Sequence, residues 1–325
     1  MIDGRVFVTR HIHPDAVDLL LREFASVDVW EEWTPPTPEQ LRERAKGCVA
    51  LITMVTERVD AALLDAVPTL KVVANVATGY DNFDLAAAAE RGVLMSNTPR
   101  VLEETTADLA FALILAVSRR IVEAGQDASA GRWGPWDPLK WLGHDVHHQT
   151  LGIVGLGKMG RQVAKRAKGF DMRVLYTAKG RHSEDEQELG VEYVQALPEL
   201  LGEADFVSLH VPLTEQTQHL IDAKALRAMK PTAYLINTSR GEVVDQEALV
   251  EALKDGVIAG AGLDVMTPEP LPSDHPLYGF SNVVMTPHIG SATVATRRRM
   301  TTMAAENAIA ACNGTPMSGR LEASP

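Results

Sequence analysis

The sequence has little that points to an exported, disulfide-bonded or membrane-anchored protein. Only two cysteines, Cys48 and Cys312, occur among 325 residues. They are too few for a disulfide framework, and each is surrounded by apolar residues as a small hydrophobic side chain would be. The first residues lack a basic segment followed by an apolar stretch, so we expect no secretory signal. The longest apolar run, 109–117, is far shorter than the roughly 20 residues that span a bilayer. We therefore expect a cytoplasmic protein that does not bind membranes.

Positive charge is also scarce. The chain has 31 Lys and Arg against 43 Asp and Glu, a formal net charge of −12. Such a chain repels phosphate backbones. The one dense basic run, Arg297–Arg299, lies within a helical pattern, where a solvated helix face or a subunit contact is more common than a phosphate site. We therefore expect no nucleic-acid partner.

A metal site has weak support. His144, His147 and His148 have a spacing that could bring imidazoles together. However, they lie in a linker with no cysteine among them, whereas zinc sites usually add cysteine or carboxylate ligands. We expect no bound metal.

The length and composition predict two ordinary globular domains. A chain of 325 residues is too long for one common core, since domains usually contain roughly 100–200 residues. Its 46% hydrophobic and 23% charged content is typical of a soluble, fully folded protein. Two domains would leave a cleft between them.

Short β-branched runs alternate with helical segments in two successive series, which is the pattern of parallel α/β sheets. The first series comprises 6–8, 27–29, 49–52, 72–74 and 93–95. The second comprises 151–154, 174–176, 206–209, 234–236 and 283–285. We therefore predict an α/β protein with two doubly wound parallel sheets.

Three further segments have distinct patterns. Glu103–Ile121 is apolar on nearly every face of a helix, so we expect it to be buried all round, partly by a second subunit. Residues 131–138 combine Gly, Pro and Trp and predict a structured loop. The tail after Asn313 is mostly small and polar, and we expect it to fray.

The clearest local motif is the turn Gly155-Leu156-Gly157-Lys158-Met159-Gly160, which follows the buried run 151–154 and opens a helical pattern. Alone this glycine spacing is a weak signal, but a preceding strand and a following helix make it typical of dinucleotide binding. Gly155 would permit the tight turn, and Gly157 would let the backbone approach the pyrophosphate. Gly160 would let helix and strand pack closely, with the phosphate at the helix N-terminus.

The residues after the second strand of this series select the nicotinamide cofactor. An acidic side chain there would bind an unmodified ribose, and none is present at the end of 174–176. The strand is followed by Lys179 and Arg181, cations suited to a 2′-phosphate. Glu184–Glu186, just beyond, could weaken this charge. We predict a preference for NADP over NAD.

Three ionisable residues follow in the last third of the chain, and a cation, a carboxylate and an imidazole beside a dinucleotide turn indicate an enzyme. Arg240 has a guanidinium fork that can bind a carboxylate and a carbonyl oxygen together. His288 carries an imidazole, which can give and take one proton near neutral pH. Glu269 is a carboxylate that would orient the imidazole and favour its charged form.

These motifs resemble the D-isomer-specific 2-hydroxyacid dehydrogenase family. The resemblance runs from about Arg5 to about Asn313 and depends mainly on the glycine turn, on 237–245 around Arg240, and on the surroundings of Glu269 and His288. It implies a Rossmann-type dinucleotide domain, about 99–289, inserted into a flavodoxin-like substrate domain of about 1–98 and 290–325. A helix of about 291–311 would cross back to complete the substrate domain.

The resemblance also implies individual contacts. Arg240, Glu269 and His288 would be catalytic. Substrate would bind Arg240 and the loop residues Ala77, Thr78 and Gly79, where backbone amides receive the carboxylate; Thr78 departs from the apolar residue common there. Besides the glycine turn, Lys179 and Arg181, cofactor contacts would come from Thr106, His210, Val211, Pro212, Thr238, Ser239, Asp264 and Gly290.

The glyoxylate and hydroxypyruvate reductase branch of this family is most similar. It implies a homodimer that reduces a small 2-keto acid to the D-2-hydroxy acid with a nicotinamide cofactor. Other activities of the family, such as 3-phosphoglycerate or phosphite dehydrogenase, remain alternatives. So does a nicotinamide-sensing corepressor scaffold, a binding protein of the same fold.

Overall fold

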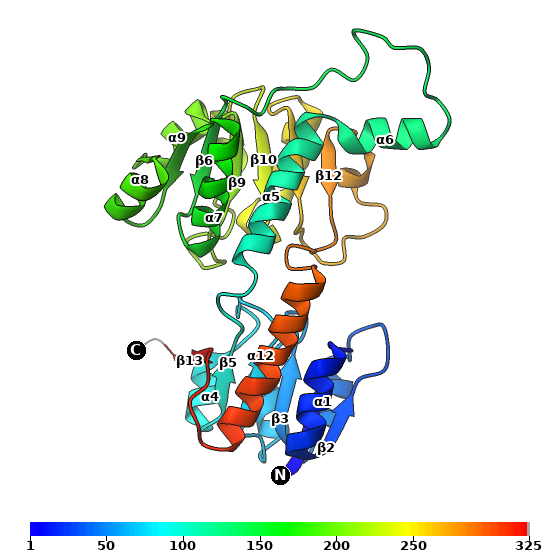
Figure 1. The fold of residues 1–325 in the computed structure, drawn as a ribbon, viewed down its shortest axis with the longest axis vertical. Helices are drawn as coiled ribbons and strands as arrows, with labels where there is room; N and C mark the ends of the chain where they lie inside the picture. Colours follow the sequence, from blue (N-terminus) through cyan, green and yellow to red (C-terminus); the bar gives the residue numbers. More distant parts are fainter. Residues whose placement is uncertain (324–325) are drawn as a thin grey trace. The chain divides into compact units, whose positions relative to one another are not determined.

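The computed structural model describes residues 1–323, which form two compact units. The first unit comprises Met1–Leu102 and the chain from Ser291 onward, and the second comprises Glu103–Gly290. The chain therefore leaves the first unit and returns to it through helix α12 (Figure 1). Each unit is a sheet covered by helices on both faces.

Six strands form the sheet of the first unit, in the spatial order β13-β5-β4-β3-β1-β2. All pairs are parallel except β13 with β5. The order 2-1-3-4-5 within it is that of flavodoxin-like folds. The strands are β1 (Ile2–Val8), β2 (Phe24–Val29), β3 (Cys48–Thr53), β4 (Val72–Asn75), β5 (Leu94–Ser96) and β13 (Arg320–Leu321).

Strand side chains of this unit alternate between two cores, because successive residues of a strand point to opposite faces. Val6 and Val8 of β1 join the core beneath α1 and α12, whereas Phe7 between them joins the core on the opposite face. Figure 1 shows α12 lying beside α1 on the same face of the sheet. The helices are α1 (Pro14–Glu23), α2 (Pro38–Ala45), α3 (Ala61–Ala66), α4 (Leu85–Glu90) and α12 (Val294–Cys312).

The expectation that the tail after Asn313 frays is wrong for the described residues. Arg320 and Leu321 pair with Ser96 and Met95 as the antiparallel strand β13. The amide of Asn97 also donates to the carbonyl of Gly319 (2.9 Å). A composition rich in small residues did not prevent pairing, because the open edge of β5 supplies unpaired backbone groups.

Seven parallel strands form the sheet of the second unit, in the order β12-β11-β10-β9-β6-β7-β8. Read from β8, this is the 3-2-1-4-5-6 order of the dinucleotide-binding fold, with one further strand. The predicted α/β fold with two doubly wound sheets is confirmed. The strands are β6 (Thr150–Val154), β7 (Arg173–Thr177), β8 (Val191–Tyr193), β9 (Phe206–Leu209), β10 (Tyr234–Asn237), β11 (Gly260–Leu263) and β12 (Val283–Met285).

Helices cover both faces of this sheet. α5 and α7 pack with Ile153 and Tyr176 on one face, and α9, α10 and α11 pack with Val154 and Leu175 on the other. No helix formed by residues 1–323 is long and apolar enough to cross a membrane. The helices are α5 (Glu103–Ser118), α6 (Ile121–Ser129), α7 (Lys158–Ala167), α8 (Ser183–Leu189), α9 (Leu197–Glu203), α10 (Ala223–Ala228) and α11 (Gln246–Lys254), with short 3-10 turns at Lys168–Phe170, Gly241–Val243 and Pro276–Gly279.

The predicted all-round burial of Glu103–Ile121 is wrong within one chain. The helix ends at Ser118, and Arg120, with φ of 53°, precedes the separate helix α6. α5 packs against α7 as well as against β10 and β11, but these elements leave Ala112 exposed. At the start of α6, Ile121 is 55% exposed. A single chain therefore leaves part of this apolar surface uncovered.

Candidate active site

The glycine turn joins β6 to α7 at the carboxyl end of the sheet. Gly155 has φ of +99°, which other residues rarely adopt, and a Cβ there would lie 2.8 Å from the carbonyl oxygen of His210. A Cβ on Gly160 would overlap the carbonyl oxygen of Gly155 and lie 3.1 Å from Ile153 Cγ2. Helix, strand and turn are therefore in direct contact, as the motif predicts.

Gly157 differs from these two glycines because it faces open space. Apart from Gly157 itself and its two chain neighbours, no heavy atom of the described chain lies within 4 Å of a Cβ built on it. Gly157 is also the N-cap of α7, and no side chain caps this end of the helix. The first amides of a helix carry partial positive charge and bind anions when no side chain satisfies them. This cradle fits a pyrophosphate, with Leu156, Lys158 and Met159 completing the turn.

The loop after β7 holds one of its two predicted cations in an ion pair. Arg181 donates three hydrogen bonds to the Glu186 carboxylate (2.8–3.1 Å), which also accepts from the Tyr176 hydroxyl (2.8 Å). The pKa of Glu186 is lowered, chiefly by the Arg181 hydrogen bonds. Glu186 therefore does weaken the charge of the loop, whereas Lys179 is exposed.

The segment after β9 places His210 against the glycine turn. Its ring nitrogen Nε2 lies 2.8 Å from the hydroxyl of Ser208, and burial lowers the pKa of His210 to about 4. The imidazole is therefore neutral at physiological pH. Val211 and Pro212 follow, and the carbonyl of Pro212 accepts a hydrogen bond from Thr217 (2.6 Å).

The segment after β10 is shaped by one asparagine. Asn237 donates to the carbonyl of Arg240 (2.8 Å) and accepts from the amide and hydroxyl of Ser239 (3.0 and 2.8 Å). Arg240 donates to the Ser239 carbonyl through Nη1 (2.8 Å). The hydroxyl of Thr238 is buried with no partner among the described residues. A buried hydroxyl without a partner is costly in a ligand-free chain, so it is a candidate ligand contact.

Asp264, at the end of β11, organises the turn that carries the histidine. Its carboxylate accepts hydrogen bonds from the Thr286 hydroxyl (2.6 Å) and from the amides of Ile289 and Gly290 (2.8 Å each). Burial raises the pKa of Asp264, against the effect of these donors. The sequence suggested a cofactor contact at Asp264; the structure adds this anchoring of the turn, which sequence reasoning missed.

The same turn holds His288 in an unusual backbone conformation. His288 has φ of 53°, and its amide donates to the Asp264 carbonyl (2.9 Å). A non-glycine residue with positive φ is strained and persists only where the surrounding structure holds it. Such residues cluster at functional sites. Thr106 of α5 donates to the carbonyl of Gly290 (3.2 Å), which fixes the end of the turn.

Glu269 and His288 form a direct pair. The carboxylate Oε2 lies 2.8 Å from His288 Nδ1, and Oε1 accepts from the Met266 amide (3.1 Å). Burial alone would raise the pKa of Glu269. The hydrogen bond and charge of His288, the Met266 amide and the charge of Arg240 outweigh it, so that the pKa lies below its ordinary value. Glu269 is therefore ionised near neutral pH. With Nδ1 donating to Glu269, Nε2 of His288 is the nitrogen left to exchange a proton.

In the first unit, the predicted substrate loop follows β4. The three carbonyls of Ala77, Thr78 and Gly79 all accept hydrogen bonds, from the Thr98 amide (2.8 Å), Asn97 Nδ2 (2.7 Å) and Asn75 Nδ2 (3.2 Å). In the part of the chain that is described, the amides of 77–79 donate to no protein group. The loop therefore offers amides to a ligand.

The hydroxyl of Thr78 is also engaged within the protein. It donates to the carbonyl of Thr98 (3.0 Å). The departure from an apolar residue at this position therefore satisfies a local backbone group, and the backbone amide remains available.

The histidine cluster in the linker shows no ligand geometry. His144 Nδ1 lies 2.8 Å from the Tyr234 hydroxyl, and the rings of His147 and His148 meet edge to face at 5.1 Å. Across residues 1–323, no group of three or more His, Cys, Asp or Glu side chains is arranged to hold a metal ion.

Comparison with known proteins identifies the group to which this geometry belongs. The family model for the D-isomer specific 2-hydroxyacid dehydrogenase, NAD binding domain, matches residues 111–290. A glyoxylate reductase from Korarchaeum cryptofilum is 53% identical over 307 residues, which cover 94% of this chain and 92% of that protein. The chain belongs to the D-isomer specific 2-hydroxyacid dehydrogenase family.

Solved structures agree over nearly the whole chain. A Thermus thermophilus protein superposes with a TM-score of 0.90 at 46% identity and covers 98% of this chain and 99% of its own. An NADPH-dependent glyoxylate/hydroxypyruvate reductase from Sinorhizobium meliloti, in complex with NADP and malonate, has a TM-score of 0.85 at 32% identity, with 98% and 96% covered. The family's NAD binding domain spans the glycine turn, Arg240, Glu269 and His288.

Proposed function

We propose that the protein reduces a small 2-keto acid, glyoxylate or hydroxypyruvate, to the D-2-hydroxy acid with a nicotinamide cofactor. The observation that carries the proposal is the 2.8 Å contact between Glu269 and His288. It lies at the carboxyl ends of parallel strands, where doubly wound sheets bind their ligands. The glyoxylate reductase relative and the dehydrogenase family support the same reaction class.

The residues have separate roles in this reaction. The Arg240 guanidinium binds the carboxylate and polarises the carbonyl oxygen, because its fork can reach two oxygens at once. His288, through Nε2, gives its proton to the oxygen that becomes a hydroxyl, and Glu269 keeps the ring oriented through Nδ1. The amides of Ala77, Thr78 and Gly79 receive the substrate carboxylate.

The glycine turn and the residues that surround it are the proposed cofactor site. When bound, the reduced nicotinamide supplies the hydride. The α7 N-terminus holds the pyrophosphate, and His210, Val211 and Pro212 form the adenine end. Further contacts come from Thr106, Thr238, Ser239, Asp264 and Gly290.

Two variants test the division of roles. Arg240→Ala should chiefly raise KM for the keto acid, because the side chain binds the ground-state carboxylate. His288→Ala should chiefly lower kcat, by about 100-fold or more, since general acid catalysis contributes about 10²–10⁴. Steady-state kinetics with glyoxylate measures both. Equal changes in KM and kcat in the two variants would contradict the assignment.

We further propose that NADP is preferred over NAD. No acidic side chain ends β7, and Lys179 and Arg181 follow it. The pairing of Arg181 with Glu186 leaves Lys179 as the main source of unneutralised charge in this loop. Lys179→Ala should therefore weaken NADPH binding and leave NADH binding unchanged in fluorescence titrations. An equal loss for both dinucleotides would refute the preference.

We propose a homodimer, and the first unit as the substrate-binding domain. A second copy would cover the apolar surface that one chain leaves open, since Trp133, Trp136 and Leu139 of the loop after α6 are 83, 87 and 77% exposed. Large exposed apolar groups at such density mark protein contacts. Light scattering at micromolar concentration tests this, and a mass of one chain would contradict it.

The cytoplasm is the compartment we propose. Both cysteines are free, and Cys48 is buried in the first unit. Free thiols of this kind are typical of proteins in reducing compartments. Fractionation of cells that express the full chain would test the assignment.

A further inference from the structure

The substrate loop of the first unit is held from its carbonyl side by two asparagines. Asn97, directly after β5, donates from Nδ2 to the carbonyl of Thr78 (2.7 Å). Asn75, the last residue of β4, donates from Nδ2 to the carbonyl of Gly79 (3.2 Å). Both asparagines are buried, with 6% and 0% of their surface exposed.

Fixing a carbonyl also fixes the next amide. A peptide group is planar and trans, so its C=O and N–H point in opposite directions. The hydrogen bond from Asn97 to Thr78 therefore orients the amide of Gly79, one of the three proposed substrate amides. The hydrogen bond from Asn75 holds the carbonyl of this same Gly79 and orients the amide of Tyr80, which continues the loop. Each amide is directed away from the asparagine that holds its plane.

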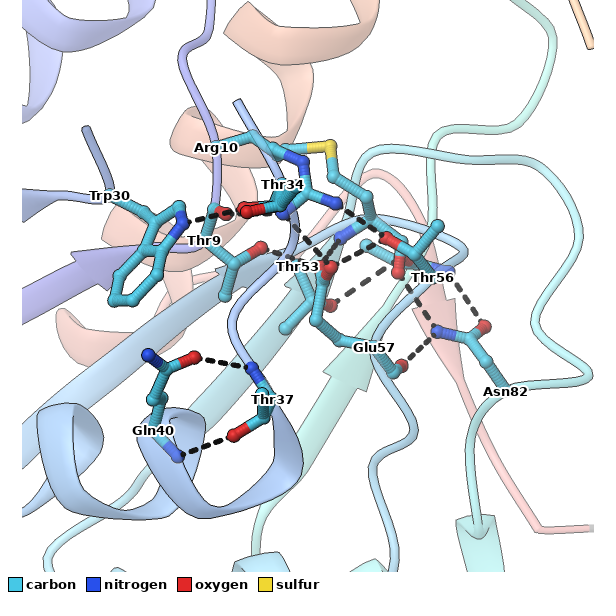
Figure 2. Close-up of polar contacts among 12 residues, drawn as sticks. Thr9, Arg10, Trp30, Thr34, Thr37, Gln40, Thr53, Thr56, Glu57 and Asn82 are labelled. Carbon is cyan, nitrogen blue, oxygen red and sulfur yellow. Dashed lines mark hydrogen bonds and ion pairs between the residues drawn. The ribbon is translucent and has the colours of Figure 1, made fainter. Parts of the chain in front are cut away.

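Asn75 is itself oriented by Asn82. Asn75 Nδ2 donates to Asn82 Oδ1 (3.1 Å), and Asn82 Nδ2 donates to the carbonyls of Met54 and Glu57 (3.1 and 2.8 Å). Figure 2 shows Asn82 reaching from its loop to the segment around Glu57. Both polar atoms of Asn82 are thus engaged in one arrangement, which ties the loop after β4 to the segment after β3.

That segment is fixed in turn by a buried carboxylate. Glu57, 3% exposed, accepts hydrogen bonds from the Thr9 hydroxyl (2.5 Å), the Thr56 hydroxyl (2.5 Å) and the Met54 amide (2.7 Å). Arg10 adds a charge contact at 3.5 Å. Figure 2 shows Thr9, Arg10 and Thr56 close to Glu57. Glu57 therefore links the segments that follow β1 and β3, and Asn82 is anchored to the second of these.

We propose that Asn97 and Asn75, the latter oriented by Asn82, are positioning residues that aim the loop amides at the carboxylate of the substrate. The inference rests on the proposed function, because it assigns the ligand of these amides to the substrate. It goes beyond that function by naming side chains that touch no substrate yet set how tightly the carboxylate binds. Preorganised donors bind an anion without the cost of ordering them at that moment.

The experiment compares three variants of the full chain. Asn97→Ala removes the donor to Thr78. Asn82→Ala leaves Asn75 in place but removes the oxygen that orients it, and so avoids emptying the fully buried position. Thr301→Ala is the control, since Thr301 is as buried in the first unit as Asn97 (6% exposed each) and also donates to backbone carbonyls, those of Arg297 and Arg298 (2.9 and 3.0 Å), which belong neither to the loop nor to the residues that hold it.

Three quantities are measured: KM for glyoxylate, the dissociation constant of oxalate from the complex with oxidised cofactor, and that of the cofactor alone. Loss of one amide contact to an anion corresponds to about tenfold or more in affinity. Asn97→Ala and Asn82→Ala should raise KM and weaken oxalate about tenfold, with cofactor affinity unchanged. Thr301→Ala should bind oxalate as the parent does, even if its Tm falls.

Each outcome decides the proposal. Oxalate affinity within twofold of the parent in both folded variants overturns it, and so does equal weakening in Thr301→Ala. A parent that binds no oxalate also overturns it. A parent that binds oxalate but does not reduce glyoxylate refutes the proposed function alone, and the oxalate comparison among the variants then still tests the positioning role.

Discussion

Replacing the glycines of the dinucleotide turn one at a time should separate packing from ligand binding. Gly157 faces open space, with φ of −77° and ψ of −162°, an extended conformation that alanine adopts without strain. Gly160 is the opposite case, because a Cβ there would overlap the Gly155 carbonyl oxygen. Gly169, which is exposed with nothing within 4 Å of an added Cβ, provides a control.

The two substitutions should change different quantities: Gly157→Ala the affinity for the cofactor, and Gly160→Ala the stability of the fold. In Gly157→Ala the methyl group would displace the pyrophosphate from the α7 amides, and hydrogen bonds to charged groups are worth about 1.5–3 kcal/mol. Loss of one such bond weakens cofactor binding about 10- to 150-fold, at 1.4 kcal/mol for each factor of ten. Gly160→Ala overpacks the turn, which typically costs about 1–3 kcal/mol. For a unit of this size that lowers Tm by about 2–12 °C.

Thermal melts without cofactor and fluorescence titrations with NADPH measure the two effects. Gly157→Ala should melt with the parent and bind NADPH weakly. Gly160→Ala should melt earlier, and Gly169→Ala should match the parent in both assays. The reasoning is refuted if Gly157→Ala binds NADPH as tightly as Gly169→Ala does, because the open space at Gly157 would then not be the pyrophosphate site.

Three further substitutions test the charged groups. Arg240→Lys keeps the charge but loses the fork, so kcat/KM for glyoxylate should fall about 100-fold, mostly through KM; a loss below threefold would contradict bidentate binding. Glu269→Gln should lower kcat, and its stability should show a pH signature. Because the pKa of Glu269 is lowered, the contact of its ionised carboxylate with His288 stabilises the fold above the ordinary carboxyl pKa, and this effect is lost as the pH falls through the lowered pKa. The Tm gap between parent and variant should therefore be largest near neutral pH and close on acidification, and a constant gap would argue against the pair. Glu186→Gln releases Arg181 and should strengthen NADPH binding without affecting NADH; no change would show that Arg181 is remote from the 2′-phosphate.

Local patterns predicted most of the fold because its strands are buried on both faces. Runs such as 151–154 and 206–209 are almost wholly apolar, as expected of central parallel strands. β8, β11 and β13 were absent from the two predicted series; β11, with the sequence Gly-Ala-Gly-Leu, is buried but has no β-branched residue. β8 is only three residues long and has an exposed glutamate at its centre, and β13 depends on the open edge of β5 rather than on its own composition.

The sequence predicted those parts of the site in which the residue types and their spacing have a chemical reason. The glycine turn has a physical reason for each glycine, and the structure shows the close approaches at Gly155 and Gly160 that such a turn requires. The support around the site could not be foreseen. Glu57 gave no signal beyond an acidic residue after a buried strand, and the anchoring of the His288 turn by Asp264 depends on contacts across 22–26 residues of sequence.

The extent of α5 burial was misjudged for a related reason. An apolar helix indicates what needs to be covered, but not which molecule covers it. Ala112 is exposed in the single chain, so the pattern is consistent with a partner rather than with the chain's own core.

The most direct test is the initial rate of NADPH and NADH oxidation, followed side by side with glyoxylate and with hydroxypyruvate, for the parent and for His288→Ala. The account predicts oxidation that depends on the keto acid, is faster with NADPH, and is lost in His288→Ala. Cofactor that binds to the parent yet is not oxidised with either keto acid would contradict the reductase assignment and would favour a dinucleotide-sensing scaffold.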